Sequence, residues 1–562
     1  MSEAGLRVLI VGGYGVFGGR LAQLLADDSR FVLIVAGRSK QKAQFFCDGL
    51  PAKAELIPAF FDRNAELDAQ IKTFKPAIIV DASGPFQGYG NNPYKLVNAA
   101  LARGIHYIDL ADGSDFVVGI KQFDVAAKQK NIFILSGVSS FPVLTAAVVR
   151  HLSQDLSAVE TITGGIAPSP YAGVGLNVIR AIASYAGKKV PLTRNGEPSF
   201  AYGLTETKRY TICPPGYLPL KSTLFSLVDV PDLQILPLQW PGLKSIWIGA
   251  GPVPVILLRG LNLLARGTRY RCLPSLSFLA PVFYWVINTL RWGEHRGGMY
   301  VSIDGKKGDG STVTRSWHLL AEGDDGPFIP SMAVAAILFK CVNEKYPIAG
   351  ARSAITEIEL SDYEKIFSRH AIYSGCRESG VNQDSPLYQR VLGSAWDDLP
   401  PAIRAMHNLS SSRTAQGRAD VERGSHLFSR LIGGLFRFPK QGNDIPLTVT
   451  FTADGQGEIW TRQFGDKSFS SYQVAGKGRS DKLLNESFGP FFFGLALVVS
   501  EGRLSLVIRR WTLLGIPLPL FLAPFGDSFE YVKNDCFHFN VEIRIRLIGL
   551  IVRYRGHLTL TD

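Results

Sequence analysis

Five glycines stand among residues 12–19, directly after the apolar run Val8–Val11. Glycine loses more backbone freedom on folding than any other residue, so such a cluster is expected only where the chain turns sharply or approaches another group closely. A helical segment follows, in which Leu21, Leu24 and Leu25 share one face. A strand, a glycine-rich turn and a helix in immediate succession restrict the fold of this part of the chain more than any other feature.

Gly13, Gly15 and Gly18 match the pattern GxGxxG between the predicted strand and the predicted helix. In such a loop the first glycine permits a tight turn, the second lets the backbone approach a pyrophosphate, and the third permits close helix–strand packing. Gly12, Gly15 and Gly18 also match GxxGxxG, the spacing of extended short-chain dehydrogenases, so the loop leaves the subclass open. The candidate residues for the pyrophosphate are Gly13, Tyr14, Gly15, Val16, Phe17 and Gly18.

Apolar runs typical of buried parallel strands recur through the first 140 residues, and segments with helical spacing separate most of them. The runs are Arg7–Val11, Phe31–Ala36, Leu56–Phe61, Ala77–Ala82, Tyr107–Leu110 and Ile132–Leu135. This alternation predicts an α/β fold with a doubly wound parallel sheet, in which ligands bind beyond the carboxyl ends of the strands.

The second predicted strand ends in VAGRSK, which places Arg38 and Ser39 where an NAD-binding site carries an acidic residue for the ribose 2′-hydroxyl. A carboxylate would repel a 2′-phosphate, whereas a guanidinium binds it through paired charge-assisted hydrogen bonds. The sequence therefore predicts NADP(H) as the cofactor, with Arg38 and Ser39 at its 2′-phosphate. The alternative is that Arg38 is only a solvated loop residue.

The fourth predicted strand leads into DASGPFQGYG, residues 81–90. Its small residues Ala82, Ser83 and Gly84 would let a dinucleotide pass close to the backbone, and Pro85 would stiffen the turn. We expect these four residues to complete the cofactor site, together with the ends of the fifth and sixth strands.

Five segments in this order resemble the NADP-binding domains of the saccharopine dehydrogenase-like family. They are GGYGVFGG (12–19), VAGRSKQKA (35–43), DASGPFQGYG (81–90), HYIDLADG (106–113) and SGVSSFPVLTAAVV (136–149). The resemblance implies a Rossmann domain over 1–145, a mixed α/β domain for substrate or dimerisation over 146–325, and a return of the chain to the first domain over 326–372. The family includes lysine-pathway reductases and enoyl reductases of lipid synthesis, so membership does not choose a substrate.

Residues 385–562 form a separate region that begins with helical spacing and continues with alternating strands. LTVTFTADGQGEIWTRQF, with a turn at Asp454-Gly455, predicts a hairpin. We expect an α+β domain whose curved antiparallel sheet surrounds a cavity lined with Phe, Leu and Trp. It resembles the uncharacterised C-terminal domain often fused to bacterial saccharopine dehydrogenase-like proteins. A lipid-binding accessory role is our hypothesis, and a purely structural or dimerisation sheet is the alternative.

The formal net charge of +12 is concentrated around the most apolar segment, residues 246–290. Between Pro241 and Tyr300 there are seven basic residues and one acidic residue. These basic residues flank an apolar segment, whereas nucleic-acid-binding proteins usually interleave basic residues with polar and aromatic ones. The pattern therefore favours an anionic membrane surface over nucleic acid as the partner. The insert could be a buried helical pair, an interfacial hairpin or the wall of an apolar substrate tunnel. The uncharged segment Cys272–Leu290 is long enough for a transmembrane helix, but Pro274 and Pro281 interrupt it.

Catalytic residues are weakly marked. The motif YxxxK occurs as Tyr185 to Lys189, beyond the sixth strand and therefore outside its usual context, although Tyr185 could still face the site from the second domain. His106, Asp109 and Asp112 are further candidates for the proton donor. Each also has a structural interpretation, because a histidine can cap a strand and an aspartate can hydrogen-bond turn backbone.

The six cysteines are scattered singly, without the clusters of a disulfide framework or a zinc site, so we expect no bound metal and a cytoplasmic protein. Contact with the inner face of the membrane through 246–290, and a homodimer, are further expectations. The sequence predicts an NADPH-dependent oxidoreductase acting on an apolar or lipid-linked carbonyl, enoyl or imine. The alternatives are saccharopine-type amino acid chemistry, which would need an arginine-lined polar cleft, and a non-catalytic NADP-binding lipid-handling protein.

Overall fold

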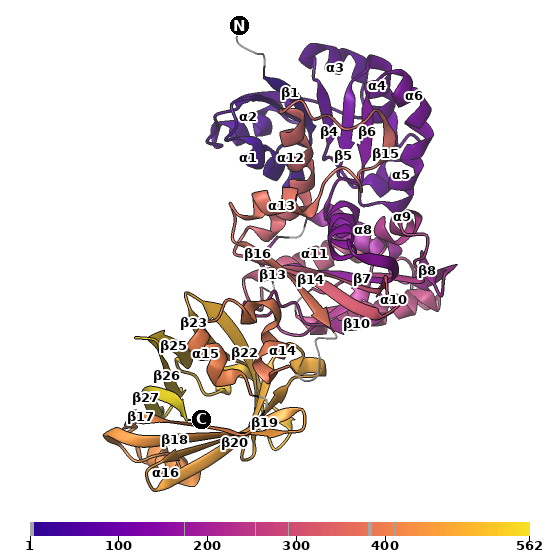
Figure 1. Ribbon diagram of the computed structural model, residues 1–562. Coiled ribbons are helices and arrows are strands. Elements are labelled where there is room, and N and C mark those ends of the chain that lie inside the picture. Colours follow the sequence, from indigo (N-terminus) through magenta and orange to yellow (C-terminus); the bar gives the residue numbers. More distant parts are fainter. Residues whose placement is uncertain are drawn as a thin grey trace. The chain divides into compact units, whose positions relative to one another are not determined.

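The computed structural model describes residues 5–173, 175–252, 254–289, 291–379, 385–409 and 411–561. The chain divides into two compact units, of which the first contains Met1–Lys208 and Leu224–Tyr373. The second contains Ser374–Asp562 together with Arg209–Thr223, a segment from the middle of the predicted second domain. The α/β class, with a Rossmann domain, a mixed second domain and a C-terminal antiparallel sheet, is confirmed (Figure 1).

The first domain is a seven-stranded parallel sheet in the order β15-β6-β5-β4-β1-β2-β3. Its strands are β1 (Leu6–Val11), β2 (Phe31–Gly37), β3 (Glu55–Phe60), β4 (Ile78–Asp81), β5 (His106–Asp109), β6 (Phe133–Ser136) and β15 (Gly350–Ser353). The strand order reverses at β1, between β4 and β2, so the glycine-rich loop after β1 lies at the point where doubly wound sheets bind nucleotides.

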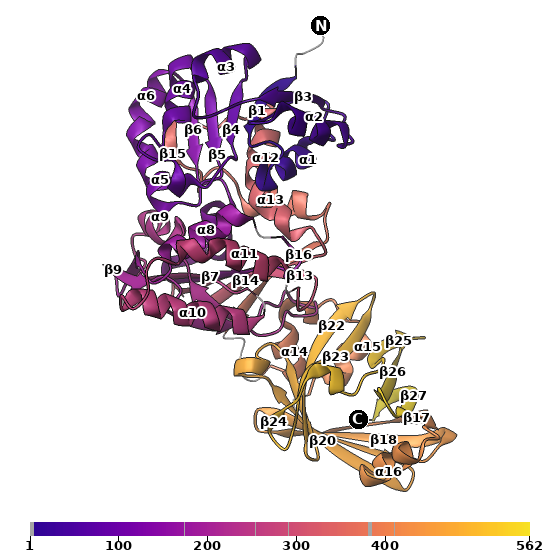
Figure 2. The same ribbon diagram turned by 180° about the vertical axis from the view of Figure 1, so that it is seen from behind.

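Helices flank this sheet, and their apolar residues bury the strands (Figures 1 and 2). They are α1 (Val16–Leu25), α2 (Lys40–Asp48), α3 (Leu67–Phe74), α4 (Lys95–Arg103), α5 (Ser114–Gly119) and α6 (Asp124–Gln129). All seven residues of β2 are buried, because a central parallel strand is covered on both faces.

The chain returns to the parallel sheet after the second domain. Helix α12 (Ile329–Cys341) packs beside α1, where the Ser331 hydroxyl donates a hydrogen bond of 2.9 Å to the carbonyl oxygen of Phe17. Strand β15 then pairs with β6, and α13 (Leu360–Phe367) follows. Ten of the thirteen residues of α12 are buried, which explains why its sequence is apolar on all sides.

The second domain contains a mixed sheet in the order β10-β11-β12-β7-β13-β14-β16 and a separate hairpin, β8-β9. The strands are β7 (Leu156–Ala167), β8 (Lys189–Arg194), β9 (Glu197–Tyr202), β10 (Thr207–Tyr210), β11 (Thr223–Leu227), β12 (Ser245–Ala250), β13 (Arg296–Lys307), β14 (Thr312–Glu322) and β16 (Ile372–Ser379). Its helices are α7 (Thr145–Leu152), α8 (Leu176–Tyr185), α9 (Asp232–Gln239), α10 (Val255–Arg269) and α11 (Ala280–Thr289).

The apolar insert 246–290 forms β12 and the two helices α10 and α11. Val253 and Leu290 lie outside the described residues. Both α11 and the short helical turn before it pack against α8. Within the parts of the chain that the structure describes, every helix is too short or too polar to cross a membrane.

The C-terminal unit is an antiparallel sheet of eleven strands that closes on itself through pairing of β22 with β23 (Figure 2). The strands are β17 (Arg413–Arg423), β18 (Gly442–Asp454), β19 (Gly457–Phe464), β20 (Lys467–Ala475), β21 (Leu484–Phe488), β22 (Phe491–Ser500), β23 (Arg503–Leu513), β24 (Ile516–Pro517), β25 (Phe529–Lys533), β26 (Cys536–Ile545) and β27 (Gly549–Thr561). Ten strands form the ring, and β24 adds to β23. Closure leaves few unpaired sheet edges.

Three helices accompany this ring: α14 (Leu387–Leu392), α15 (Pro401–His407) and α16 (Leu427–Leu435). Because β17 begins just after α15 and ends just before α16, these two helices lie at opposite ends of the strands, which we name the α15 end and the α16 end. Figures 1 and 2 show α14 and α15 together, away from α16.

Candidate functional site

The glycine-rich loop folds around the carbonyl oxygen of Gly12. Gly12 has a φ of +81°, and the amide of Gly15 donates a hydrogen bond of 2.8 Å to the Gly12 carbonyl oxygen. A Cβ at Gly18 would overlap that same oxygen, and a Cβ at Gly13 would lie 2.8 Å from the carbonyl oxygen of Ile10. The structure thus gives a steric reason for glycine in both of the patterns noted in the sequence.

Helix α1 presents an uncapped amino terminus beside this loop. Its N-cap, Gly15, makes no side-chain cap, and its first turn contains no acidic residue. Gly15 and Val16 are exposed, while Tyr14 and Phe17 are half-buried. Free N–H groups and the positive end of the helix dipole therefore face solvent, which is the arrangement that binds a pyrophosphate.

Arg38 follows β2 and is exposed, and it forms no ion pair within the described residues. Ser39 is committed locally, because its amide donates a 3.0 Å hydrogen bond to the Tyr14 hydroxyl and its own hydroxyl caps α2. The Tyr14 ring lies over Gly37, where a Cβ would come within 2.6 Å of it. Of the two predicted phosphate-binding residues, Arg38 therefore has the free hydrogen-bonding groups.

The turn after β4 lies against the glycine loop, since a Cβ at Gly12 would be 2.8 Å from the Ala82 carbonyl oxygen. The Ser83 hydroxyl and amide donate hydrogen bonds of 2.5 and 3.0 Å to Asp81 Oδ1. Gly84 and Pro85 continue the turn, and their backbone is half-buried. Ala82 and Ser83 thus border the pyrophosphate loop, with the polar groups of Ser83 turned toward Asp81.

Asp109 is fully buried at the end of β5. Its Oδ1 accepts hydrogen bonds from the amides of Ala111 and Gly137 and from the Ser136 hydroxyl, at 2.9–3.0 Å. Its Oδ2 has no hydrogen-bond partner among the described residues. Burial raises the pKa of Asp109 to about 7, and the nearby charge of Asp81 acts in the same direction. Asp109 holds the ends of β5 and β6 together rather than facing a cleft.

Three titratable side chains from distant parts of the sequence lie close enough beyond this edge of the sheet for their charges to act on one another: Asp112, Tyr185 and Asp229. Solvent reaches Asp112, yet protein surrounds its carboxyl group closely enough that burial raises its pKa. Burial, followed by the charges of Asp229 and Asp112, raises the pKa of Tyr185 well above its usual range. We use the name acidic cleft for these three side chains alone.

Neighbouring polar groups orient the two carboxylates of the acidic cleft. The Gln87 amide donates a 3.1 Å hydrogen bond to Asp112 Oδ1, and the Ser114 hydroxyl donates a 2.8 Å hydrogen bond to Asp229 Oδ1. Burial raises the pKa of Asp229 as well. Two carboxyl groups with raised pKa values beside a phenol form a set that can donate protons.

Helix α8 connects the acidic cleft to the cofactor loop. It begins after Gly175, where a Cβ would lie 3.7 Å from Val16, and it ends at Tyr185. Its ten residues span roughly 15 Å at 1.5 Å per residue.

Comparison with known families agrees with this geometry. A family model described as the saccharopine dehydrogenase NADP binding domain matches residues 8–133. The first domain belongs to this family. A second family model, described as a domain of unknown function (DUF4166), matches residues 399–558.

Several solved structures are similar to about two thirds of the chain. Saccharopine dehydrogenase (L-Glu forming) from Saccharomyces cerevisiae is 11% identical, with a TM-score of 0.46, and the match covers 67% of this chain and 100% of that one. A meso-dapdh mutant from Clostridium tetani (13%, TM-score 0.33, 64% and 93%) and biliverdin reductase from Synechocystis sp. (13%, TM-score 0.29, 65% and 96%) are further examples. No curated protein matches the chain. Sequence identities and TM-scores this low say nothing about the activity of this chain.

The saccharopine dehydrogenase-like domain places His106 away from the acidic cleft. His106 begins β5, at the amino edge of the sheet, whereas the cofactor loop and the cleft lie at the carboxyl edge. Its Nδ1 accepts a 3.1 Å hydrogen bond from the amide of Phe133, and its ring stacks on the Phe133 ring at 4.2 Å. Burial lowers the pKa of His106 and so favours the neutral ring. His106 therefore serves the packing of the sheet.

Sequence reasoning named Asp112 and Tyr185 separately and missed Asp229. Asp229 follows β11 in the second domain, inside the segment VDVPD, which matches no catalytic motif. Only the packing of the second domain against α5, where Ser114 meets Asp229, brings this carboxylate to the cleft. The YxxxK motif carries no weight in this site, since Lys189 begins β8 and is exposed.

Proposed function

We propose that this protein is an NADP(H)-dependent oxidoreductase that acts on an apolar or lipid-linked carbonyl, enoyl or imine in the acidic cleft. The observation that carries the proposal is the meeting of Asp112, Tyr185 and Asp229 at the carboxyl edge of a saccharopine dehydrogenase-like NADP-binding domain. Family membership supplies the cofactor class, and the cleft supplies groups that can move a proton.

The cofactor's nicotinamide, when bound, supplies or accepts a hydride. The chain binds and orients it: the loop Gly12–Gly18 and the start of α1 hold the pyrophosphate, and Arg38 holds the 2′-phosphate. No acidic residue stands beside Arg38 in the segment Gly37–Lys42 to repel that phosphate. NADPH is therefore favoured over NADH.

The acidic cleft manages the proton that accompanies reduction. The raised pKa of Asp112 and Asp229 extends the pH range over which these carboxyl groups stay protonated, so either can donate a proton to a substrate heteroatom or carbon. Tyr185 keeps its proton throughout this range and donates a hydrogen bond that orients the substrate. Because solvent reaches Asp112, its proton can be replaced after each turnover.

The charge of the cleft argues for an apolar substrate. The charges that act on Tyr185 and Asp112 come from aspartate carboxylates of the protein. These would repel a substrate that itself carries several carboxylates. The apolar insert also packs, through α11, on the helix that carries Tyr185. Ile256 and Trp285 of the insert are 71% and 66% exposed, and arginines such as Arg259 stand among these apolar residues. Apolar side chains beside arginines favour delivery of the substrate from a membrane surface.

The experiment uses Tyr185→Phe, Asp112→Asn and Asp229→Asn, with Tyr270→Phe, an exposed tyrosine of the same unit, as control. NADPH binding is titrated by fluorescence, and NADPH oxidation is followed with a long-chain aldehyde, an enoyl thioester and a cyclic imine. We expect unchanged NADPH binding in all four variants and turnover lowered roughly 100-fold in at least one cleft variant. Equal turnover in the wild type and all three cleft variants would refute the assignment of the cleft.

A matched pair of variants tests the cofactor assignment. Arg38→Ala should raise the dissociation constant for NADPH about tenfold or more, ~1.4 kcal/mol, and leave that for NADH unchanged. The control is Lys53→Ala, an exposed basic residue of the same domain. Equal affinity of the wild type for the two nucleotides would contradict the 2′-phosphate site.

A further inference from the structure

The closed sheet of the C-terminal unit surrounds a cavity of about 1260 Å³. Sites for drug-sized ligands are typically roughly 300–1,000 Å³, so this space suits a larger molecule. Most of its lining is aromatic or aliphatic, with Phe451, Phe488 and Ile543 as examples from three strands. The positive and negative side chains of the lining are nearly equal in number. Two of them, Arg462 and Glu486, form an ion pair at 3.6 Å inside the wall. The lining therefore favours a hydrocarbon body over a charged one.

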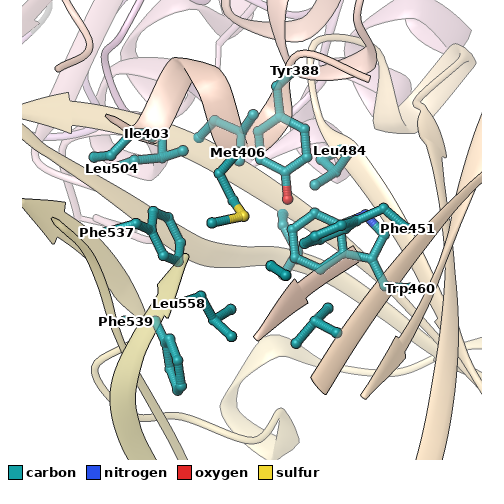
Figure 3. Close-up of a cluster of buried hydrophobic side chains, with 14 of the residues drawn as sticks. Tyr388, Ile403, Met406, Phe451, Trp460, Leu484, Leu504, Phe537, Phe539 and Leu558 are labelled. Carbon is teal, nitrogen blue, oxygen red and sulfur yellow. The ribbon is translucent and has the colours of Figure 1, made fainter. Parts of the chain in front are cut away.

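The α15 end of the cavity is closed. Tyr388 of α14 and Met406 of α15 point into the ring toward Phe451, Trp460 and Phe537 (Figure 3). A buried polar pair completes the closure, since His407 Nε2 and Glu530 Oε2 lie 2.6 Å apart. The Tyr388 ring stacks on the His407 ring at 3.7 Å. Buried side chains therefore fill this part of the ring.

The α16 end carries nearly all of the exposed apolar side chains. Among the described residues 385–561, eleven large apolar side chains are exposed, and ten of them belong to α16 or to turns at its end. We name these ten the apolar rim: Leu427, Phe428, Leu431, Leu435, Leu514, Ile516, Phe521, Leu522, Phe525 and Leu547. Leu435 and Phe525 also line the cavity, so the rim surrounds its mouth.

The strand register shows that the rim belongs to one end. Arg423, just before α16, pairs with Val552 near the start of β27, and Gly549 pairs with Ile545 across the turn that contains Leu547. The bridge between Phe525 and Arg544 places the segment 520–525 at the same end. On the other side of the ring, the strand register places three more turns at the α16 end: those joining β19 to β20, β21 to β22 and β23 to β24.

Positive charge accompanies the apolar rim. Arg430 and Arg437, in and just after α16, and Arg546, beside Leu547, are exposed and form no ion pair within the described residues. Lys440 and Asp466 at this end pair with each other at 3.5 Å. Apolar side chains interspersed with unpaired arginines are complementary to the interface of an anionic bilayer.

We propose that the C-terminal unit docks on an anionic lipid bilayer through the apolar rim and takes the hydrocarbon part of a membrane lipid into its cavity. A bilayer explains the rim and the cavity together, because a lipid entering at the α16 end moves from one apolar environment into another. A protein partner would cover the rim and leave the cavity unexplained. The proposal requires neither NADPH nor turnover and stands apart from the proposed redox function.

Vesicle binding by the full-length protein tests the docking. Wild-type protein should sediment with vesicles of equal parts phosphatidylcholine and phosphatidylglycerol, and about tenfold less with phosphatidylcholine alone. The double variant Leu431→Glu/Leu514→Glu should lose at least tenfold of the binding to anionic vesicles. Ile348→Glu, an exposed apolar residue of the first unit, is the control and should bind like the wild type. Full vesicle binding by the double variant would overturn the docking proposal. So would rim substitutions that change the oligomeric state and leave vesicle binding unchanged.

Occupancy of the cavity is measured with the neutral fluorophore N-phenyl-1-naphthylamine, displaced by phosphatidylglycerol. Val541→Trp fills the cavity, and Ile545→Trp fills it nearer the mouth, where less of the core is disturbed. Each should lower probe affinity at least tenfold, while Gln416→Trp, on the exposed face of β17, should not. Thermal unfolding checks that each variant is folded. Probe affinity unchanged in both folded cavity variants would overturn the cavity assignment.

Discussion

Replacing Asp109 with asparagine should stabilise the Rossmann domain above neutral pH and leave it nearly unchanged in acid. The Asp109 side chain is fully buried, its Oδ1 accepts three hydrogen bonds, and its Oδ2 has no partner among the described residues. An asparagine keeps an acceptor oxygen for the three donors and cannot ionise. The substitution therefore removes the buried charge with little change in shape.

The magnitude follows from the pKa of Asp109, raised by burial from 3.8 to about 7. Between these two values the folded state binds more protons than the unfolded state, so stability falls as pH rises. The full penalty is present above about pH 7 and is absent below about pH 4. About three pH units at ~1.36 kcal/mol each give an upper value of about 4 kcal/mol.

The assay is urea unfolding followed by hydrogen exchange of peptides from β5 and β6, which reports on this domain alone. Wild type and Asp109→Asn are compared at several pH values from 4 to 8. The free energy of unfolding of the variant should exceed that of the wild type by a growing amount as pH rises. Asp27→Asn, a highly exposed carboxylate, should follow the wild type. Parallel curves for Asp109→Asn and wild type would refute the reasoning.

Three further predictions concern the loop, the cleft and the C-terminal unit. Gly18→Ala should weaken NADPH binding at least tenfold, because its Cβ overlaps the Gly12 carbonyl oxygen, whereas Gly308→Ala, in open space, should not. Reductive kcat/KM should fall as pH rises past the raised pKa of Asp229, and Asp229→Asn should flatten that part of the profile if Asp229 is the donor. Arg377→Met should destabilise the C-terminal unit by about 3 kcal/mol in thermal unfolding, because the buried guanidinium donates to two backbone carbonyls at 2.8 and 2.9 Å.

Each of these can fail in a defined way. Tight NADPH binding by Gly18→Ala would mean that the loop does not hold the pyrophosphate. A pH profile unchanged in Asp229→Asn would assign the proton to another group. An unaltered melting temperature for Arg377→Met would show that the buried arginine does not fasten the segment Arg209–Thr223 to the C-terminal unit.

The cofactor half of the site could be predicted because it is local. The glycines after β1, the turn at Ala82–Pro85 and the residues Arg38 and Ser39 each follow a strand directly, and parallel strands bring their carboxyl ends to one edge of the sheet. Hydrophobic alternation likewise predicted the curved antiparallel sheet, because inward and outward residues alternate along each strand. Sequence alone therefore determined the fold classes, the nucleotide loop and the candidate for the 2′-phosphate.

Tertiary structure decided what distant segments do together. Asp229 joins Asp112 and Tyr185 only after the second domain packs on the first, and no spacing in the sequence records that meeting. Pairing of β22 with β23 closes the ring, and only closure makes a chamber of the apolar strand faces and gathers the scattered residues of the apolar rim at its mouth. The physical reason is the range of the interactions: turn and helix geometry depends on near neighbours along the chain, whereas burial and strand pairing join residues of any separation.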